Sequence, residues 1–123
     1  DRPHVAALLA AADIFCLPSD TEGFSTAVLE AAAAGCYLVA TAVGGTPELV
    51  KEDGGTLLED SRPETICAAL DWACAHPEER AAAAERTRTR LEECFTWERT
   101  ALAAERAVKE LREHESADHC AGL

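Results

Sequence analysis

Short apolar runs recur along the first sixty residues, and polar or glycine-rich breaks separate them. Residues 4–12 follow Pro3, which suits the first turn of a helix, and their apolar content predicts a helix there. The β-prone run Ile14–Leu17 is apolar on both faces and ends at Pro18, as a buried parallel strand would. The chain is therefore predicted to begin with a helix and a buried strand.

The next forty residues predict a second strand joined to the first through a helix. Residues 24–34 are apolar all round and end at Gly35, a common helix stop. A second buried run, residues 37–41, then leads into the turn Gly44-Gly45. The order strand, helix, strand predicts an α/β fold, with a Rossmann-like parallel sheet and flanking helices.

Beyond residue 46 the pattern becomes mainly helical. Glu and Arg recur three or four residues apart in the later helices, which is typical of solvated helix faces. The predicted elements are a helical turn at 47–50, a strand at 56–58, and helices at 63–75, 78–94 and 97 to about 113.

Length and composition predict one domain. A chain of 123 residues with 48% hydrophobic residues can bury one core. We expect one domain over residues 1–115 and a flexible tail over 116–123. The chain opens at Asp1 and contains no Met, so it is expected to be cut from a longer protein.

The charge balance bears on the partners. The formal net charge is −12, and Arg2 is the only Lys or Arg among the first fifty residues. Nucleic acids and anionic membranes are bound through clusters of Lys and Arg, so neither is an expected partner. No apolar stretch reaches the roughly 18 residues of a membrane span, so no transmembrane segment is expected. A phosphate site in this part of the chain would rely on backbone amides.

Cysteine, histidine and tryptophan residues are assigned structural or solvent-exposed positions. His114, His119 and Cys120 lack the spacing of metal ligands, so no metal site is expected. Trp72 and Trp97 occur among alanines and are predicted to anchor the core. The cysteines form no CxxC pair and are interpreted as buried free thiols of a cytoplasmic protein: Cys16, Cys36, Cys67, Cys74, Cys94 and Cys120.

The loop that follows the first strand is the first candidate site. Ligands collect beyond the carboxyl ends of strands in an open parallel sheet, and residues 18–26 lie there. Gly23 lets the backbone approach a ligand closely. The amides of Phe24, Ser25 and Thr26 are expected at a helix N-terminus, which can bind phosphate without lysine.

Glu22 and Glu30 are candidate sugar-binding carboxylates. In one continuous helix, eight residues would separate them by roughly 12 Å along the axis. Two carboxylates beside a phosphate-binding helix start could hold the two ends of a sugar nucleotide. Alternatively, Glu22 only favours the helix dipole and Glu30 is an ordinary surface residue.

Gly44 and Gly45 form a second candidate loop. Two glycines before a short helix place amides at the carboxyl edge of the sheet, beside the first loop if the two strands are neighbours. A plain turn is the alternative interpretation, although it explains one glycine more readily than two.

These motifs together resemble the family 4 retaining glycosyltransferases. The likeness includes the E-x7-E signature at Glu22 and Glu30, and it covers nearly the whole chain. Ser25, and Cys36 with Tyr37, depart from the usual residues. The matching segments are Ala12 to Ser19, Glu22-Gly23-Phe24, Leu29-Glu30-Ala31, Ala34-Gly35, Val39-Ala40-Thr41, Val43 to Val50 and Cys94-Phe95-Thr96-Trp97.

The resemblance implies that residues 1–115 form a partial nucleotide-sugar-binding domain, in the C-terminal half of a two-domain GT-B enzyme. Such an enzyme would transfer a hexose-type sugar from a nucleotide diphosphate sugar to a glycan or lipid. Glu22 would contact the transferred sugar as the catalytic residue, and Glu30 would hold the ribose. No cofactor or catalytic metal is implied. The other donor-binding positions would be Ser19, Gly23, Phe24, Ser25, Thr26, Gly44 and Gly45.

The same likeness implies partners outside this chain. An N-terminal acceptor domain, and an Arg and a Lys that neutralise the diphosphate, would lie upstream, so the chain alone is expected to be inactive. That domain could also bring the enzyme to a membrane surface. Competing hypotheses are a sugar-nucleotide epimerase or phosphorylase on the same scaffold, and a non-catalytic phosphate-binding module.

Overall fold

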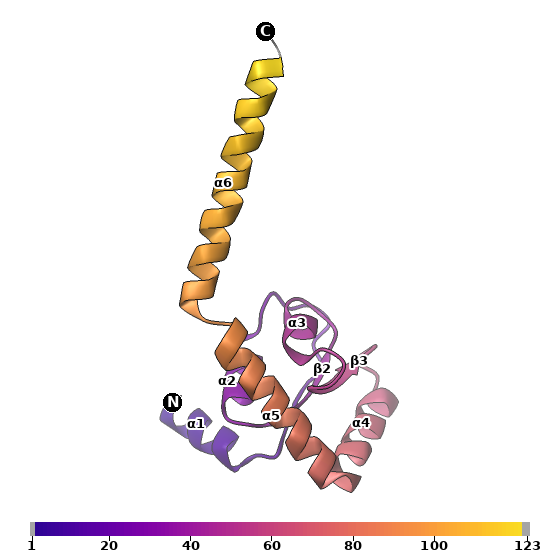
Figure 1. Ribbon diagram of the computed structural model, residues 1–123. Helices are drawn as coiled ribbons and strands as arrows, with labels where there is room; N and C mark the ends of the chain where they lie inside the picture. Colours follow the sequence, from indigo (N-terminus) through magenta and orange to yellow (C-terminus); the bar gives the residue numbers. More distant parts are fainter. Residues whose placement is uncertain (1, 122–123) are drawn as a thin grey trace. The chain divides into compact units, whose positions relative to one another are not determined.

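The computed structural model describes the backbone of residues 2–121 and the side chains of residues 3–110. The chain divides into two compact units, one ending at Glu92 and the other beginning at Glu93. The first unit holds the sheet and most of the helices, and the second consists mainly of one long helix (Figure 1). The elements are α1 Arg2–Ala11, β1 Ile14–Leu17, α2 Thr26–Ala33, β2 Tyr37–Thr41, α3 Thr46–Val50, β3 Gly55–Leu58, α4 Pro63–Ala75, α5 Pro77–Cys94 and α6 Trp97–Ala121.

The three strands form one parallel sheet in the order β1-β2-β3. Ile14 of β1 pairs with Tyr37, and Leu38 of β2 pairs with Gly55. Each crossover between neighbouring strands contains a helix, α2 or α3, as parallel strands require. The predicted α/β fold with a Rossmann-like parallel sheet is confirmed.

The central strand β2 is buried along its whole length and divides the core into two sides. Tyr37 and Val39 join a cluster with Leu58 and with buried alanines of α4 and α5. Because strand side chains alternate, Leu38 and Ala40 point to the opposite face. α2 packs on β1 and β2, and α3 packs on β2 and β3. The sheet is therefore covered by helices on both sides.

Alanine lets the helices approach the sheet closely. Ala69 and Ala73 of α4, and Ala83 and Ala84 of α5, are all buried in the cluster around Val39. A methyl side chain costs little conformational entropy on burial, and helices favour it. The alanine-rich composition thus builds a thin core between α4, α5 and the sheet.

Several predicted helix boundaries differ from the structure, and the start of α2 and the end of α6 matter most. α2 begins at Thr26, two residues later than expected, because residues 22–25 form an extended and turning loop. α6 continues to Ala121, past the end expected near Glu113. Flexibility of residues 116–123 stays a prediction, and residues 122 and 123 lie outside the described part.

The prediction of tryptophan core anchors is wrong. Trp97 is 87% exposed and Trp72 is 42% exposed. Trp72 stacks on His76 one turn later in the chain, with ring centroids 4.6 Å apart. On α4 the alanines Ala69 and Ala73, rather than Trp72, pack in the core against the sheet.

The cysteines divide by location. The five described cysteines are free, as predicted, but Cys67, Cys74 and Cys94 are exposed, which corrects the expectation of burial. Cys36 is buried, and its thiol lies 3.3 Å from the carbonyl oxygen of Leu9. Burial raises the pKa of the Cys36 thiol. Cys120, with His114 and His119, lies outside the residues whose side chains are described.

Candidate functional site

The carboxyl ends of β1, β2 and β3 meet at one edge of the sheet, because all three strands are parallel. The loop of residues 18–25 follows β1, the loop of residues 42–45 follows β2, and residues 59–62 follow β3. Both candidate loops predicted from the sequence therefore lie at the edge where open α/β sheets bind ligands.

The first two loops are in direct contact. The Gly45 amide donates a hydrogen bond to the carbonyl oxygen of Gly23 at 2.9 Å. Gly44 has a φ of 55°, and a Cβ atom there would overlap the Gly23 carbonyl oxygen. Glycine is required at residue 44 both by its left-handed backbone and by this close approach. The prediction that the two glycine-bearing loops lie side by side is confirmed.

Phe24 covers the second glycine. A Cβ atom at Gly45 would collide with the Phe24 ring, so the ring lies against the backbone of residue 45. The Phe24 side chain is still 38% exposed. The two glycines thus serve different contacts: Gly44 accommodates a backbone carbonyl, and Gly45 accommodates an aromatic ring.

Glu22 is half-buried and held from within its own loop. The Ser19 hydroxyl donates a hydrogen bond to Glu22 Oε1 at 3.0 Å. The Ser19 carbonyl oxygen in turn accepts a hydrogen bond from the hydroxyl of Thr41, the buried last residue of β2. Thr41 was not singled out in the sequence. The feature of the sequence that could have identified Thr41 is its hydroxyl group at the end of an otherwise apolar strand.

The loop after β3 joins the same edge. The Ser61 hydroxyl donates to Asp20 Oδ1 at 2.7 Å and so connects the first and third loops. A side-chain hydrogen bond from Thr65, with further donors from Arg62, lowers the pKa of Asp60. All three loops at the carboxyl edge are therefore fixed by hydrogen bonds or close packing.

The start of α2 carries the remaining candidate residues. Ser25 occupies the N-cap position, but its side chain makes no capping hydrogen bond. The first-turn amides of a helix have no partner within the helix, and here the Ser25 hydroxyl does not supply one. Thr26, the first residue of α2, is exposed beside this position.

Glu30 lies within α2, four residues after its start, whereas Glu22 lies in the loop before that helix. It is an exposed residue one turn into α2, and together with Thr26 it lines a groove of about 780 Å³ whose opposite wall is Val5, Ala6 and Leu9 of α1. The estimate of about 12 Å between the two glutamates assumed helix from residue 22 onward. Glu22 precedes α2 by four residues, so the helix that this estimate assumed does not extend to residue 22, and the distance itself stays a prediction.

Two kinds of feature are absent from the described part of the chain. Among side chains 3–110, no group of three or more His, Cys, Asp or Glu is placed to hold a metal ion. Across the same described region, no helix combines the length and apolarity needed to cross a membrane.

Fold and loop geometry now define the class of protein. Residues 1–90 match the family model described as glycosyl transferases group 1, and the chain belongs to this family. Its parallel sheet with flanking helices is Rossmann-like, as expected, and its structural neighbours are GT-B glycosyltransferases.

Curated relatives are glycosyltransferases. The chain is 36% identical over 100 residues to an MMP alpha-(1->4)-mannosyltransferase of Mycolicibacterium hassiacum, covering 80% of this chain and 24% of that protein. It is 37% identical over 103 residues to a GDP-mannose-dependent alpha-(1-6)-phosphatidylinositol dimannoside mannosyltransferase of Mycobacterium tuberculosis, covering 84% of this chain and 26% of the relative. The chain therefore spans about a quarter of the length of these relatives.

Solved structures show the same fold. Sucrose-phosphate synthase from Thermosynechococcus elongatus superposes with a TM-score of 0.76 at 28% identity, over 93% of this chain and 29% of that chain. The C-terminal domain of a glycosyl transferase group 1 family protein from Francisella tularensis gives a TM-score of 0.71 at 28% identity. That comparison covers 79% of this chain and 50% of the solved chain.

Proposed function

We propose that this chain forms part of the donor site of a retaining glycosyltransferase of family 4. The protein that carries it would transfer a sugar from a nucleotide diphosphate sugar to a glycan or lipid acceptor, without a catalytic metal. One observation carries this proposal: the Gly23 and Gly44-Gly45 loops pack together at the carboxyl edge of the sheet, beside the half-buried carboxylate of Glu22.

The loops offer the chemistry that such a donor needs. Backbone amides at residues 23–26 lead into the N-terminus of α2, whose dipole favours an anion such as the diphosphate. The Ser19 hydroxyl holds one carboxylate oxygen of Glu22, which leaves the other oxygen available to a sugar hydroxyl. We assign Glu22 to the sugar undergoing transfer.

We assign Glu30 to the ribose. Its carboxylate is exposed at the groove between α1 and α2, so the ribose of a nucleotide could enter this groove from solvent and bind Glu30. Thr26 shares that groove and adds a hydroxyl beside the start of α2. This arrangement would place the diphosphate between the sugar contact at Glu22 and the ribose contact at Glu30.

Positive charge for the diphosphate must come from elsewhere in the protein. The first fifty residues contain six Asp or Glu and one Arg. Two carboxylates beside a diphosphate repel it unless a cation intervenes. We therefore propose that the basic pair and the acceptor-binding domain belong to segments outside this chain. Their link to a membrane surface, and a cytoplasmic location, remain predictions.

The proposal is tested with the intact protein, assayed for release of nucleoside diphosphate with and without acceptor. GDP-mannose is the first donor to assay, since one relative is named as GDP-mannose-dependent. Glu22→Ala is expected to lower kcat by about tenfold to a hundredfold, the effect of one lost charged hydrogen bond, with little change in nucleotide affinity. Glu30→Ala should instead weaken binding of the nucleoside diphosphate with or without a sugar, because a ribose contact is shared by ground and transition states.

Two controls sharpen the test. Glu30→Gln keeps one acceptor oxygen and should be milder than Glu30→Ala. Glu78→Ala removes an exposed carboxylate of α5 and should leave kinetics at the parent level. An unchanged kcat for Glu22→Ala at saturating donor would remove the assignment of Glu22. An isomerised sugar nucleotide would favour the epimerase alternative. A product formed by cleavage with inorganic phosphate, without transfer to an acceptor, would favour the phosphorylase alternative.

A further inference from the structure

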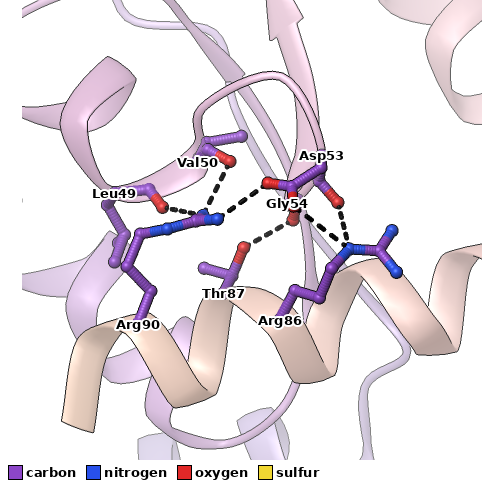
Figure 2. Close-up of polar contacts among 7 residues, drawn as sticks. All are labelled: Leu49, Val50, Asp53, Gly54, Arg86, Thr87 and Arg90. Atoms are coloured by element: carbon purple, nitrogen blue, oxygen red, sulfur yellow. Dashed lines mark hydrogen bonds and ion pairs between the residues drawn. The ribbon is translucent and has the colours of Figure 1, made fainter. Parts of the chain in front are cut away.

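Three side chains of α5 hold the turn of residues 51–54, which connects α3 to β3. Figure 2 shows Arg86, Thr87 and Arg90 reaching from successive positions of the helix toward this turn. The Thr87 hydroxyl donates to the buried carbonyl oxygen of Gly54 at 2.7 Å, and Arg86 Nε donates to the carbonyl oxygen of Asp53 at 2.9 Å.

Arg90 makes the most extensive of these contacts. Its Nη1 donates to the carbonyl oxygens of Leu49 at 2.7 Å and Val50 at 3.0 Å, the last two residues of α3. Its Nη2 donates to Asp53 Oδ1 at 2.7 Å. The side chain is only 15% exposed. A cation that bonds the last carbonyls satisfies acceptors that a helix end leaves without internal partners.

The turn that Arg90 holds has an unusual backbone. Lys51, just after α3, has a φ of 52°, which is uncommon for a residue with a side chain. Gly54 lies so close to α5 that a Cβ atom at residue 54 would collide with the Thr87 hydroxyl. Such a backbone persists only where its surroundings fix it, and α5 provides those contacts.

The opposite end of α3 lies at the donor loops. α3 has five residues, so its two ends are only about 7.5 Å apart along the axis. Its first residue, Thr46, is buried, and Gly45 immediately before it donates to the Gly23 carbonyl. A helix this short moves as one piece, so a shift at Leu49 and Val50 also shifts Gly45.

We propose that Arg90 is a positioning residue for the donor site: by holding the carboxyl end of α3, it fixes Gly44-Gly45 against Gly23. Arg90 reaches no donor loop itself, and its effect passes through α3. The role in donor binding rests on the proposed function, whereas the effect on the loop does not.

Arg86 supplies a matched control. It lies one turn earlier on α5 and also pairs with Asp53, but it contacts the carboxylate and carbonyl of Asp53 rather than the carbonyls of α3. Its side chain is 48% exposed. Arg86→Ala therefore removes an Asp53 contact while leaving the carboxyl end of α3 held.

The deciding measurement is amide hydrogen exchange on the intact protein. Arg90→Ala is expected to speed exchange of the amides of residues 44–46 and 48 by about tenfold, and Arg86→Ala by less than about threefold. Exchange of residues 38–40 in β2 should stay at the parent rate. Arg90→Lys keeps the charge but loses the forked geometry, so an intermediate rate is expected. If Arg90→Ala does not fold, the exchange rate of Arg90→Lys tests the positioning role instead.

The outcomes separate this inference from the proposed function. Unchanged exchange at residues 44–46 and 48, or an equal increase in β2, would overturn the positioning role, since the second result means general destabilisation. With the expected exchange pattern, the donor KM should rise by about fivefold or more in Arg90→Ala, with a smaller change in kcat and partial recovery in Arg90→Lys. The expected exchange pattern with an unchanged donor KM would support the effect on the loop and contradict the donor role of Gly44-Gly45.

Discussion

At the residue scale, the glycines at residues 23, 35 and 44 are distinguished by what surrounds them. Gly44 combines a positive φ with contact against the Gly23 carbonyl. Gly35 has a φ of 85° with nothing within 4 Å of a Cβ position, and Gly23 has open space there. These three positions allow strain and steric overlap to be measured separately.

We expect Gly44→Ala to be the most destabilising of the three changes. Gly35→Ala should cost about 1 kcal/mol from its left-handed backbone alone. Gly44→Ala adds displacement of the Gly23 carbonyl and should cost about 2 to 4 kcal/mol. Gly23→Ala should change stability by less than about 0.5 kcal/mol, since nothing crowds its Cβ. Urea unfolding of the three variants measures this order, and equal losses for Gly44 and Gly35 would contradict the close contact between the loops.

Also at the residue scale, the type of a side chain in the sequence did not by itself predict its contacts or its burial. Glu22 was identified from its spacing to Glu30, but its hydrogen bond to Ser19 depends on the fold of the loop. The tryptophans were misassigned because their size suggested core positions, whereas alanines occupy the space between α4 and the sheet. Hydrophobicity alone does not show how far a helix stands from its sheet.

At the element scale, the α3–β3 turn couples acid stability to α5. A side-chain hydrogen bond from Arg90, strengthened by the charges of Arg90 and Arg86, lowers the pKa of Asp53. The carboxyl group binds its proton less readily in the folded than in the unfolded chain. Its stabilising effect is therefore present above the pKa of an unfolded aspartate, about 4, and is lost as the pH falls through the lower folded value.

Asp53→Asn should remove this pH dependence. The variant should be less stable than the parent at pH 7, and the difference should shrink as the pH is lowered below about 4. Urea midpoints measured from pH 7 to pH 2.5 follow the two curves. A difference that stays constant over this range would show that the Asp53 charge does not stabilise the turn.

At the scale of the whole molecule, charge and size limit what this chain does alone. The first fifty residues carry five more acidic than basic side chains, yet the proposed ligand is a diphosphate. Holding an acceptor against a donor can supply roughly 7 to 11 kcal/mol of barrier lowering, and the proposed acceptor domain lies outside this chain.

We therefore expect residues 1–123 alone to show no acceptor-dependent transfer and at most weak nucleotide binding. Calorimetric titration with uridine, guanosine and adenosine diphosphate sugars measures the binding, and release of nucleoside diphosphate with and without acceptor extracts measures the turnover. The intact protein is the positive control for both assays. Sustained acceptor-dependent release by the isolated chain would show that it is more than a partial donor domain.

The sequence by itself determined the order of elements and the family. Strand runs such as Ile14–Leu17 and Tyr37–Thr41 are short, apolar and bounded by Pro or Gly, so local patterning suffices to locate them. The two glycine loops follow these strands directly. Their shared edge then follows from the parallel arrangement that a helical crossover requires.

Only the tertiary structure decided which groups meet. The contact of Gly44 with Gly23 joins residues twenty-one positions apart, and that of Arg90 with Leu49 joins residues forty-one apart. Local propensity carries no information about such pairs, because they depend on strand order, register and the distance at which α5 packs. Likewise, the start of α2 at Thr26, which leaves Glu22 in the loop and Glu30 in the helix, follows from how the loop folds against its neighbour, which a helical periodicity cannot specify.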